Sequence, residues 1–575
     1  MKDYEKEYER WLNSPSLTPE ERAAVAAVTS PEERELAFGC RMEFGTAGLR
    51  SSMAQGPGHM NDRTVAHATQ GMADLILSRG GAERGCVIGY DSRHNSERFA
   101  KVAAEVLAAS GIRVYLFDGI RPTPELSFAV RRLSCIAGIN ITASHNPKEY
   151  NGYKAYWEDG AQLSPEDAAV VSGVMDRIDV LDGARRMPLD KAIEAGLVTM
   201  LGEEFDEEYL AAVESTVIDR DLLRRASEHL SIVYTPLHGA GRRLVPEILR
   251  RAGLREIHPV PEQMVPDGDF PTVYKPNPEY AEVFTLGIAL AERVGSDIVI
   301  ATDPDSDRTG VVTRTKDGSF VTISGNKMGA LLLDYIIGAR RRVGNLPEGA
   351  YTIKSIVSTD LASRIAATHG IRLYDVLTGF KYIGEVIKNH EERGEEDLFI
   401  FGFEESYGYL TGTYARDKDA VGTSLMIAEM TAYYEERGMT LADALDELDK
   451  KYGIYREKTT EIYMEGLDGL ERQRRVMQAL RDCPPKQLGG LRVVSIGDYS
   501  KGYFTNVDTG ERTEITQPQS DVLYFVTETD DKVVIRPSGT EPKIKLYFLV
   551  HGDREEEAEE KIRRFTEDTA AFAEA

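Results

Sequence analysis

Residues 144–147, with the sequence Ser-His-Asn-Pro, could carry nucleophilic chemistry. They follow an apolar run at residues 135–141 that predicts a buried strand. Loops at strand ends often carry functional side chains, because the strand fixes their position. Ser144 offers a reactive hydroxyl, and His145, Lys154 and the N–H groups of the turn could stabilise charge beside it. A plain polar turn after a core strand would explain the same residues.

Three aspartates, Asp303, Asp305 and Asp307, follow a second predicted strand at residues 297–301. Carboxylates this close repel each other unless a cation lies between them, and Mg²⁺ with oxygen ligands is the simplest answer. An EF-hand loop would need Gly and Glu at two positions where this chain has arginine. A solvated acidic turn is the simpler alternative to a metal site.

The same stretch also fits the DxDxT pattern of haloacid-dehalogenase phosphatases, with Asp305 as the nucleophile. Those enzymes place the nucleophilic aspartate directly at the strand end. Here Asp303 and Pro304 intervene, so this interpretation is the second choice.

Two further loops could bind the parts of a phosphosugar. Glu404 and Ser406 follow an apolar strand at residues 398–403, and a carboxylate can accept hydrogen bonds from sugar hydroxyls. A charged surface loop explains them equally well. Residues 536–543, Arg-Pro-Ser-Gly-Thr-Glu-Pro-Lys, offer guanidinium, hydroxyl, backbone and ammonium donors for a dianion. Nucleophile, cation, hydroxyl acceptor and phosphate cradle together indicate phosphoryl transfer on a phosphosugar.

A repeated pattern of strand, helix and strand positions these loops. It occurs at residues 86–117, 232–257 and 351–374, and in each copy a glycine ends the helix. Such units predict three α/β domains with parallel strand pairing. Short β-like segments followed by a charged helix predict a C-terminal α+β domain. The expected fold is therefore three similar α/β domains with mixed or parallel sheets, plus an α+β domain, around a central cleft.

Domain boundaries are expected near residues 205, 320 and 455. The four expected domains are 1–205, 206–320, 321–455 and 456–575. Each holds one site loop: the serine loop at Ser144, the aspartate loop at residues 303–307, which is expected to bind metal, the sugar loop at residues 404–406 and the phosphate loop at residues 536–543. Two short helices are expected within residues 1–38, the second starting after Ser30 as N-cap.

Composition narrows the partners and the compartment. The chain has 575 residues and a net charge of −26, which argues against nucleic acid or an anionic membrane as a partner. Four scattered cysteines show no metal-binding spacing and suit reduced thiols in the cytoplasm. No apolar run follows the charged N-terminus and none is long enough to span a bilayer, so neither a signal peptide nor a membrane segment is expected.

The chain resembles the α-D-phosphohexomutase superfamily, and within it the phosphoglucomutases. The resemblance covers nearly the whole length, and the four motifs stand in the family order: Thr-Ala-Ser144-His-Asn-Pro, the aspartate loop, the Glu404/Ser406 loop and the Arg536–Thr540 loop. It implies an isomerase in which a phosphorylated Ser144 and the three aspartates hold Mg²⁺. Glucose 1-phosphate and glucose 6-phosphate would interconvert through glucose 1,6-bisphosphate, which would also activate the enzyme.

The resemblance also assigns roles to individual residues. Arg50, Lys154 and His145 would stabilise charge or transfer protons beside Ser144. The residues expected to bind substrate are Arg308, Thr378, Gly379, Lys381, Glu404, Ser406, Lys418, Arg536, Ser538, Gly539, Thr540 and Lys543. A monomer or weak homodimer with a phosphosugar substrate is expected.

Two departures bear on the substrate. The sugar loop lacks the Gly-Glu-Met-Ser-Gly-His form of the bacterial phosphomannomutase branch, which weakens mannose phosphate as a substrate. Residues 148–154 resemble the branch that also holds phosphopentomutases, so ribose phosphate stays open. A phosphatase centred on Asp305 and a phosphosugar-binding protein without catalysis are the other two hypotheses.

Overall fold

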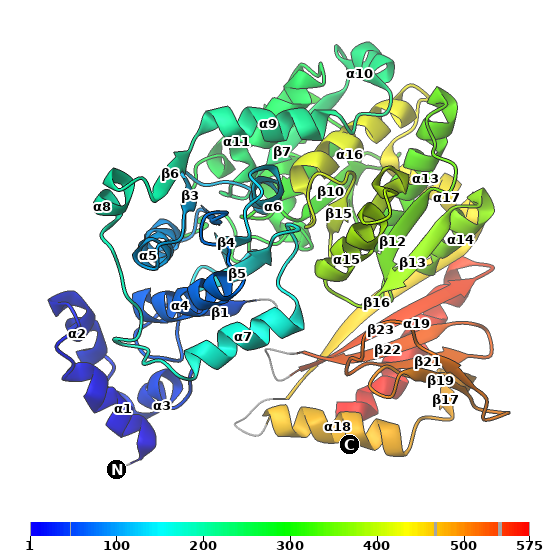
Figure 1. The fold of residues 1–575 in the computed structure, drawn as a ribbon. Coiled ribbons are helices and arrows are strands. Elements are labelled where there is room, and N and C mark those ends of the chain that lie inside the picture. Colours follow the sequence, from blue (N-terminus) through cyan, green and yellow to red (C-terminus); the bar gives the residue numbers. More distant parts are fainter. Residues whose placement is uncertain (1, 46–47, 465–468, 539–542, 574–575) are drawn as a thin grey trace.

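The computed structural model describes residues 2–45, 48–464, 469–538 and 543–573. Figure 1 shows three α/β units that follow one another along the chain, and a fourth unit, coloured orange to red, beside the third. Each unit is built on its own β-sheet. The expected fold class of three α/β units and a C-terminal α+β unit is confirmed.

Helices precede the first unit: α1 (Asp3–Leu12), α2 (Pro19–Ala26) and α3 (Pro31–Phe38). Ser30 caps α3 as expected, and its side chain accepts from the N–H of Glu33. Thr18 caps α2 in the same way, and its own N–H donates in return to the Glu21 carboxylate. The expectation of two helices in this region was wrong, because Thr18 and the proline after it begin a helix of their own.

The first sheet has six strands in the order β1-β5-β4-β2-β3-β6. Its strands are β1 (Leu49–Ser52), β2 (Cys86–Tyr90), β3 (Val114–Phe117), β4 (Ala137–Ile141), β5 (Tyr150–Trp157) and β6 (Val198–Leu201). Its helices are α4 (Asp62–Ser78), α5 (Ser96–Ala109), α6 (Thr123–Arg132), α7 (Pro165–Met175) and α8 (Leu189–Glu194). β2 pairs in parallel with β3 and β4, whereas β5 runs antiparallel to β4.

The second sheet has the order β11-β10-β9-β7-β8 and the third the order β13-β12-β14-β15. The second unit comprises β7 (Ser231–Thr235), β8 (Glu256–Pro259), β9 (Ile298–Thr302), β10 (Thr309–Arg314) and β11 (Phe320–Ile323), with helices α9 (Glu203–Glu214), α10 (Arg220–Ala226), α11 (Gly241–Arg251) and α12 (Thr285–Val294). The third comprises β12 (Tyr351–Ser355), β13 (Arg372–Val376), β14 (Phe399–Glu404) and β15 (Gly408–Leu410), with helices α13 (Gly325–Val343), α14 (Asp360–His369), α15 (Phe380–Glu391), α16 (Ala420–Glu435) and α17 (Leu441–Tyr452).

The three units share one strand order. Counting from β2, β7 and β12, the first strand of each unit lies between two parallel partners, which are the second and third strands. The fourth strand, β5, β10 or β15, runs antiparallel beside the third. Gly111, Gly253 and Gly370 precede the second strand of each unit with positive φ values of 74°, 99° and 68°. That backbone conformation ends a helix at little cost only with glycine. The repeat expected from the sequence is confirmed.

The C-terminal unit is an antiparallel sheet in the order β16-β23-β22-β21-β18-β19-β20, with β17 paired to β18. Its strands are β16 (Ile454–Tyr463), β17 (Gln487–Leu488), β18 (Leu491–Asp498), β19 (Tyr503–Asn506), β20 (Arg512–Glu514), β21 (Leu523–Thr527), β22 (Lys532–Pro537) and β23 (Lys543–Gly552). Its helices are α18 (Gly469–Asp482) and α19 (Glu555–Ala570).

Hydrophobic contacts join the units. One cluster runs from Phe128 in the first unit through Leu244 in the second to Phe401 in the third. A smaller cluster joins Val357 of the third unit to Tyr524 of the fourth. These contacts bury apolar surface between units and so fix their relative positions. Across the described residues, no helix is both long and apolar enough to cross a membrane.

Candidate active site

Three of the four predicted site loops lie at equivalent places in the three α/β units. Each connects the third strand to the antiparallel fourth strand: β4 to β5, β9 to β10, and β14 to β15. Each loop also holds a non-glycine residue at positive φ: Ser144 at 50°, Ser306 at 52° and Tyr407 at 67°. Such backbone strain is concentrated at functional sites, where surrounding contacts offset its cost.

Ser144, in the serine loop, is buried against the aspartate loop of the second unit. Its Oγ donates to Asp303 Oδ2 at 2.7 Å and lies 3.2 Å from His145 Nδ1. Its backbone N–H donates to Thr142 Oγ1 at 2.8 Å. The first and second α/β units therefore meet at the predicted nucleophile.

The aspartate loop gathers its three carboxylates as expected for a cation site. One oxygen each from Asp303, Asp305 and Asp307 lies within 4.8 Å of the others, and all three residues are buried. Asp303 Oδ1 also accepts from the N–H groups of Asp307 and Arg308, both at 3.0 Å, so the loop folds back on its first residue. This arrangement could hold a metal ion.

Two lysines partly neutralise these carboxylates. Lys154 Nζ lies 2.7 Å from Asp305 Oδ2 and 3.0 Å from Asp307 Oδ2. Lys418 Nζ lies 3.2 Å from Asp307 Oδ2 and 2.9 Å from Asp417 Oδ1. β5 supplies Lys154, and the turn before α16 supplies Lys418, so all three α/β units contribute to one charged cluster.

The pKa directions follow from these contacts. Burial opposes the charged form of Lys154, but Asp305 and Asp307 outweigh burial and raise its pKa. Burial would also raise the pKa of Asp307, but Lys154, Lys418 and other cations lower it overall. Asp303 is different: burial, Asp305 and Asp307 hold its pKa well above the ordinary value. A protonated Lys154 can donate a proton or stabilise an anion, but cannot act as a base.

His145 and Arg50 border the serine loop. Burial, reinforced by the charges of Arg308 and Arg50, holds the pKa of His145 well below its ordinary value. The neutral imidazole therefore shares a hydrogen bond with Ser144 Oγ. Arg50, on β1, is exposed and donates to Asn146 Oδ1 at 3.2 Å.

Arg308 closes the aspartate loop. Its guanidinium forms an ion pair with Glu279 and lies 4.0 Å from Asp307 Oδ1. Burial opposes its charge, but Glu279, Asp307 and Asp303 raise its pKa. Arg308 is therefore a fixed cation beside the carboxylates.

The sugar loop lies against the turn that begins α15. Glu404 Oε1 accepts from the Gly379 N–H at 2.7 Å, and this turn also holds Thr378 and Lys381. Burial and the neighbouring Glu405 raise the pKa of Glu404 to about 7. Lys418 and Arg308 oppose this shift, which places Glu404 electrostatically close to both cations. Ser406 is half-buried in the following turn.

The described part of the phosphate loop joins β22 to β23. Arg536 lies in β22, and its charge opposes the burial that raises the pKa of Glu405 in the sugar loop. Ser538 N–H donates to the carbonyl of Lys543 at 2.8 Å, and the Lys543 ammonium forms an ion pair with Glu461. The predicted residues Gly539 and Thr540 lie outside the described residues.

Comparison with known proteins identifies the family. Residues 41–181, 207–318 and 324–452 match the phosphoglucomutase/phosphomannomutase alpha/beta/alpha domains I, II and III, and residues 507–566 match the C-terminal domain. A phosphoglucomutase of Staphylococcus epidermidis is 38% identical over 534 residues, covering 92% of this chain and 94% of that protein. This chain belongs to the phosphoglucomutase/phosphomannomutase family. It is therefore an isomerase that works by phosphoryl transfer.

Solved structures of the family share the fold. The phosphoglucomutase parafusin of Paramecium, in its open form, has a TM-score of 0.67 at 17% identity, covering 93% of this chain and 95% of that one. A phosphoglucomutase/phosphomannomutase family protein of Burkholderia thailandensis has a TM-score of 0.64 at 19% identity, covering 92% of this chain and 97% of that one.

The structure of this family member adds residues that the sequence did not single out. Thr123, which begins α6, donates its hydroxyl to Asp305 Oδ2 at 2.8 Å and its N–H to the Asp305 carbonyl, also at 2.8 Å. Asn140 donates to Thr123 Oγ1 at 2.7 Å, and Tyr156 donates to Asp417 at 2.8 Å. Tyr156 lies two residues after Lys154 and so on the same face of β5, but only the folded chain brings it to Asp417.

Proposed function

We propose that this chain interconverts glucose 1-phosphate and glucose 6-phosphate through a phosphorylated Ser144. The observation that carries this proposal is the buried contact between Ser144 Oγ and Asp303, at the edge of a three-aspartate group. A hydroxyl held beside a cation site is suited to accept and release a phosphoryl group. Relatives named phosphoglucomutase support glucose phosphate as the substrate.

The donor set fits Mg²⁺. Among the described residues, Asp305 Oδ1 and Asp307 Oδ1 are buried with no hydrogen-bond partner, while their Oδ2 atoms contact lysines. Unpaired buried carboxylate oxygens are costly unless a cation uses them. Asp303, Asp305, Asp307 and Ser144 would hold the ion. When bound, Mg²⁺ supplies positive charge that neutralises the transferring phosphoryl group.

The surrounding side chains supply the remaining charge control. Lys154 stays protonated between the aspartates and stabilises the negative charge that moves through the site. His145 orients the Ser144 hydroxyl through its neutral imidazole. Arg50, beside the serine loop, provides a cation for the incoming phosphate. Catalysis by such groups rests on positioning and electrostatics.

Substrate binding would use the other loops. Glu404 and Ser406 would bind sugar hydroxyls, with Thr378, Gly379 and Lys381 beside them. Arg308 and Lys418 would face the sugar phosphate. Arg536, Ser538, Gly539, Thr540 and Lys543 would hold the phosphate that is not being transferred.

The proposed reaction has two transfers. The Oγ–P bond of phosphorylated Ser144 breaks as the 6-hydroxyl oxygen of glucose 1-phosphate forms a new O–P bond, and the proton of that hydroxyl passes to Ser144 Oγ. The product is glucose 1,6-bisphosphate, which then reorients in the site so that its other phosphate faces Ser144. Ser144 Oγ then attacks the phosphate at carbon 1, the bond between that phosphorus and O1 of the sugar breaks, and the Ser144 proton passes to O1 as glucose 6-phosphate leaves. Free glucose 1,6-bisphosphate would activate the enzyme by phosphorylating Ser144.

Further proposals concern the whole chain. We infer domain boundaries close to residues 205, 320 and 455, moved to the nearest element ends: before α9 at Glu203, after β11 at Ile323 and before β16 at Ile454. We also infer a monomer or weak homodimer, because residues of one chain suffice for the described contacts of the charged cluster. The four cysteines are free thiols, which supports a cytoplasmic location. The net charge of −26 supports the absence of nucleic-acid and membrane partners.

The test compares the wild type with Ser144→Ala and Ser110→Ala on glucose 1-phosphate, mannose 1-phosphate and ribose 1-phosphate. Each assay contains Mg²⁺ and a trace of glucose 1,6-bisphosphate, and measures both isomerised sugar phosphate and free phosphate. Glucose 6-phosphate should form fastest, without free phosphate, and Ser144→Ala should abolish it while Ser110→Ala does not. Faster turnover of another sugar would change the substrate. Full activity of Ser144→Ala would refute the serine mechanism.

A further inference from the structure

The serine loop is held by one buried guanidinium. The Arg93 side chain is fully buried and donates to the carbonyl oxygens of Ser144 at 2.6 Å, Pro147 at 2.8 Å and Tyr150 at 3.1 Å, and also to that of Asn146. Charge-assisted hydrogen bonds of this kind are stronger than neutral ones. Arg93 therefore fixes the backbone from the proposed nucleophile Ser144 onward to Tyr150.

Asp91 holds Arg93 and the loop together. Its carboxylate lies 3.3 Å from the Arg93 guanidinium and accepts from Thr142 Oγ1 at 2.6 Å and Ser96 Oγ at 2.7 Å. Thr142 Oγ1 in turn accepts from the Ser144 N–H. A continuous network thus runs from Arg93 to the backbone of Ser144.

The second α/β unit covers the outer side of this network with Phe270. The Arg93 guanidinium lies 5.0 Å from the centroid of the Phe270 ring, a cation–π geometry. Phe270 is only 1% exposed, and its φ is 45°. A bulky residue in this backbone region is a genuine outlier, so contacts around it must hold it there.

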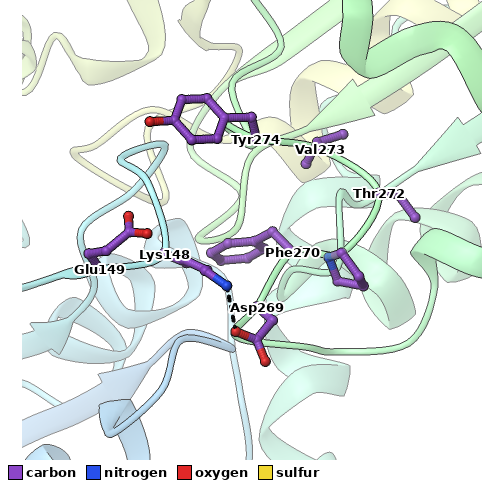
Figure 2. Close-up of a pocket in the computed structure, with 8 residues that line it drawn as sticks. Lys148, Glu149, Asp269, Phe270, Thr272, Val273 and Tyr274 are labelled. Carbon is purple, nitrogen blue, oxygen red and sulfur yellow. Dashed lines mark hydrogen bonds and ion pairs between the residues drawn. The ribbon is translucent and has the colours of Figure 1, made fainter.

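Residues 267–270 form a strap across the serine loop. Figure 2 shows Phe270 beside Lys148 and a dashed line between Lys148 and Asp269. The Lys148 ammonium lies 3.0 Å from Asp269 Oδ1, and these three residues line a cavity of about 400 Å³. Asp269 also lies 3.3 Å from His94 Nε2. A Cβ added to Gly268 would come within 2.5 Å of the His94 backbone nitrogen, so the strap lies directly on the loop that carries Arg93.

We propose that Arg93 and Phe270 are positioning residues for the phosphoryl carrier. Arg93 holds the backbone of the serine loop in place through its hydrogen bonds, and Phe270 of the second unit packs on the Arg93 guanidinium and restricts its movement. Ser144 then meets Asp303 only when the first and second α/β units are packed together. This inference rests on the proposed role of Ser144, and it makes the contact between the two units a part of the catalytic geometry.

The expected consequence is a loss of turnover rather than of substrate binding. Neither residue belongs to the set proposed to contact the sugar phosphate. A misplacement of about 1 Å at a reacting atom can cost about a hundredfold in rate. Phe270→Leu, which keeps an apolar side chain but removes the aromatic ring, should lower kcat about tenfold. Arg93→Lys, which cannot fork to several carbonyls, should lower kcat about a hundredfold.

The experiment measures kcat and KM for glucose 1-phosphate, and the rate at which glucose 1,6-bisphosphate phosphorylates Ser144, by rapid quench and intact mass spectrometry. Hydrogen exchange of the peptide spanning residues 142–152 reports the mobility of the loop. Phe320→Leu is the matched control, because Arg314 lies 4.5 Å from the Phe320 ring on the same unit, away from the serine loop. In Phe270→Leu, both rates should fall with KM within twofold, and loop exchange should quicken, while Phe320→Leu matches the wild type.

Three results would overturn the inference: unchanged Ser144 phosphorylation in Phe270→Leu, an equal loss in Phe320→Leu, or a rise in KM at constant kcat. Arg93→Lys risks misfolding because it leaves buried carbonyls unpaired, so Phe270→Leu decides the question. Failure of the proposed function gives a different result, since the wild type itself would then form no phosphoserine. That outcome would remove this inference as well.

Discussion

Lys154 offers the sharpest test of how the charged cluster is balanced. It is the shared partner of Asp305 and Asp307, and all three side chains are buried. Lys154→Met keeps the length and apolar stem but removes the ammonium. Asp307 keeps Lys418 at 3.2 Å, whereas among the described residues the Asp305 carboxylate keeps a single side-chain hydrogen-bond donor, the Thr123 hydroxyl at 2.8 Å. Removing the Lys154 ammonium therefore leaves the charge of Asp305 less compensated than that of Asp307.

The size of the effect follows from buried charge pairs. Removing one partner of such a pair costs about 3–5 kcal/mol, because the remaining charge stays buried without compensation. Without metal, Lys154→Met should therefore lower the free energy of unfolding by about 3–5 kcal/mol. Mg²⁺ would no longer face a neighbouring ammonium, so we expect it to bind about tenfold more tightly. That corresponds to about 1.4 kcal/mol of recovered stability at saturation.

Urea denaturation in EDTA and in saturating Mg²⁺ measures the loss of stability, and a calorimetric Mg²⁺ titration measures the change in affinity. Lys354→Met is the control, because Lys354 is also buried and pairs with Asp375 at 2.7 Å outside the aspartate group. Its loss of stability should be the same with and without Mg²⁺. A loss below about 1 kcal/mol in Lys154→Met, or one that Mg²⁺ leaves unchanged, would refute this account of the cluster.

Two further predictions concern pH. Because the pKa of Glu404 is raised to about 7, its carboxylate form should dominate only above that pH, so kcat/KM should rise as pH increases through about 7. Glu404→Gln should show a lower kcat/KM that does not change with pH in this range, and an unchanged profile would contradict the proposed role of Glu404 as an acceptor for sugar hydroxyls. Burial raises the pKa of Glu125 from 4.5 to about 8, with Arg121 and Arg243 opposing and Asp419 and Asp118 reinforcing the shift. As pH rises, the Glu125 carboxyl loses its proton at a lower pH in the unfolded chain than in the folded protein. The free energy of unfolding should therefore fall by at most about 1.4 kcal/mol per pH unit between pH 4.5 and 8. Glu125→Gln should flatten this slope in urea denaturation, and a slope equal to that of the wild type would refute the prediction.

Local signals made the repeated core predictable. Apolar runs gave the parallel strands, and glycines after each helix, such as Gly111 and Gly370, marked where the second strand begins. The strand β16 (Ile454–Tyr463) gave no such signal, because charged and polar residues occupy most of its length and much of it is only partly buried. Its ten paired positions against β23 stabilise it instead, and a partner distant in sequence is not visible in local patterning.

The site was predictable where the chemistry lies within one short stretch. The three aspartates and Ser144 stand out because their spacing is itself unusual. The contact of Thr123 with Asp305, and that of Phe270 with Arg93, could not be predicted, because each joins residues from different units. A phenylalanine at positive φ also has no sequence signature, since tertiary contacts hold it there.

The triplicated unit explains how one active site can be assembled from loops of different chemistry. The same connection, from β4 to β5, from β9 to β10 and from the end of β14 to β15, carries the hydroxyl of Ser144 in the first unit, carboxylates in the second and Glu404 with Ser406 in the third. No unit is complete alone, because Ser144 bonds to Asp303 and the second unit's aspartates take their lysines from the first and third. The buried charges are compensated only when the units are packed together. The contacts that balance these charges therefore also hold the three loops in register, and a change at any of these unit boundaries should alter the position of Ser144, the proposed phosphoryl carrier.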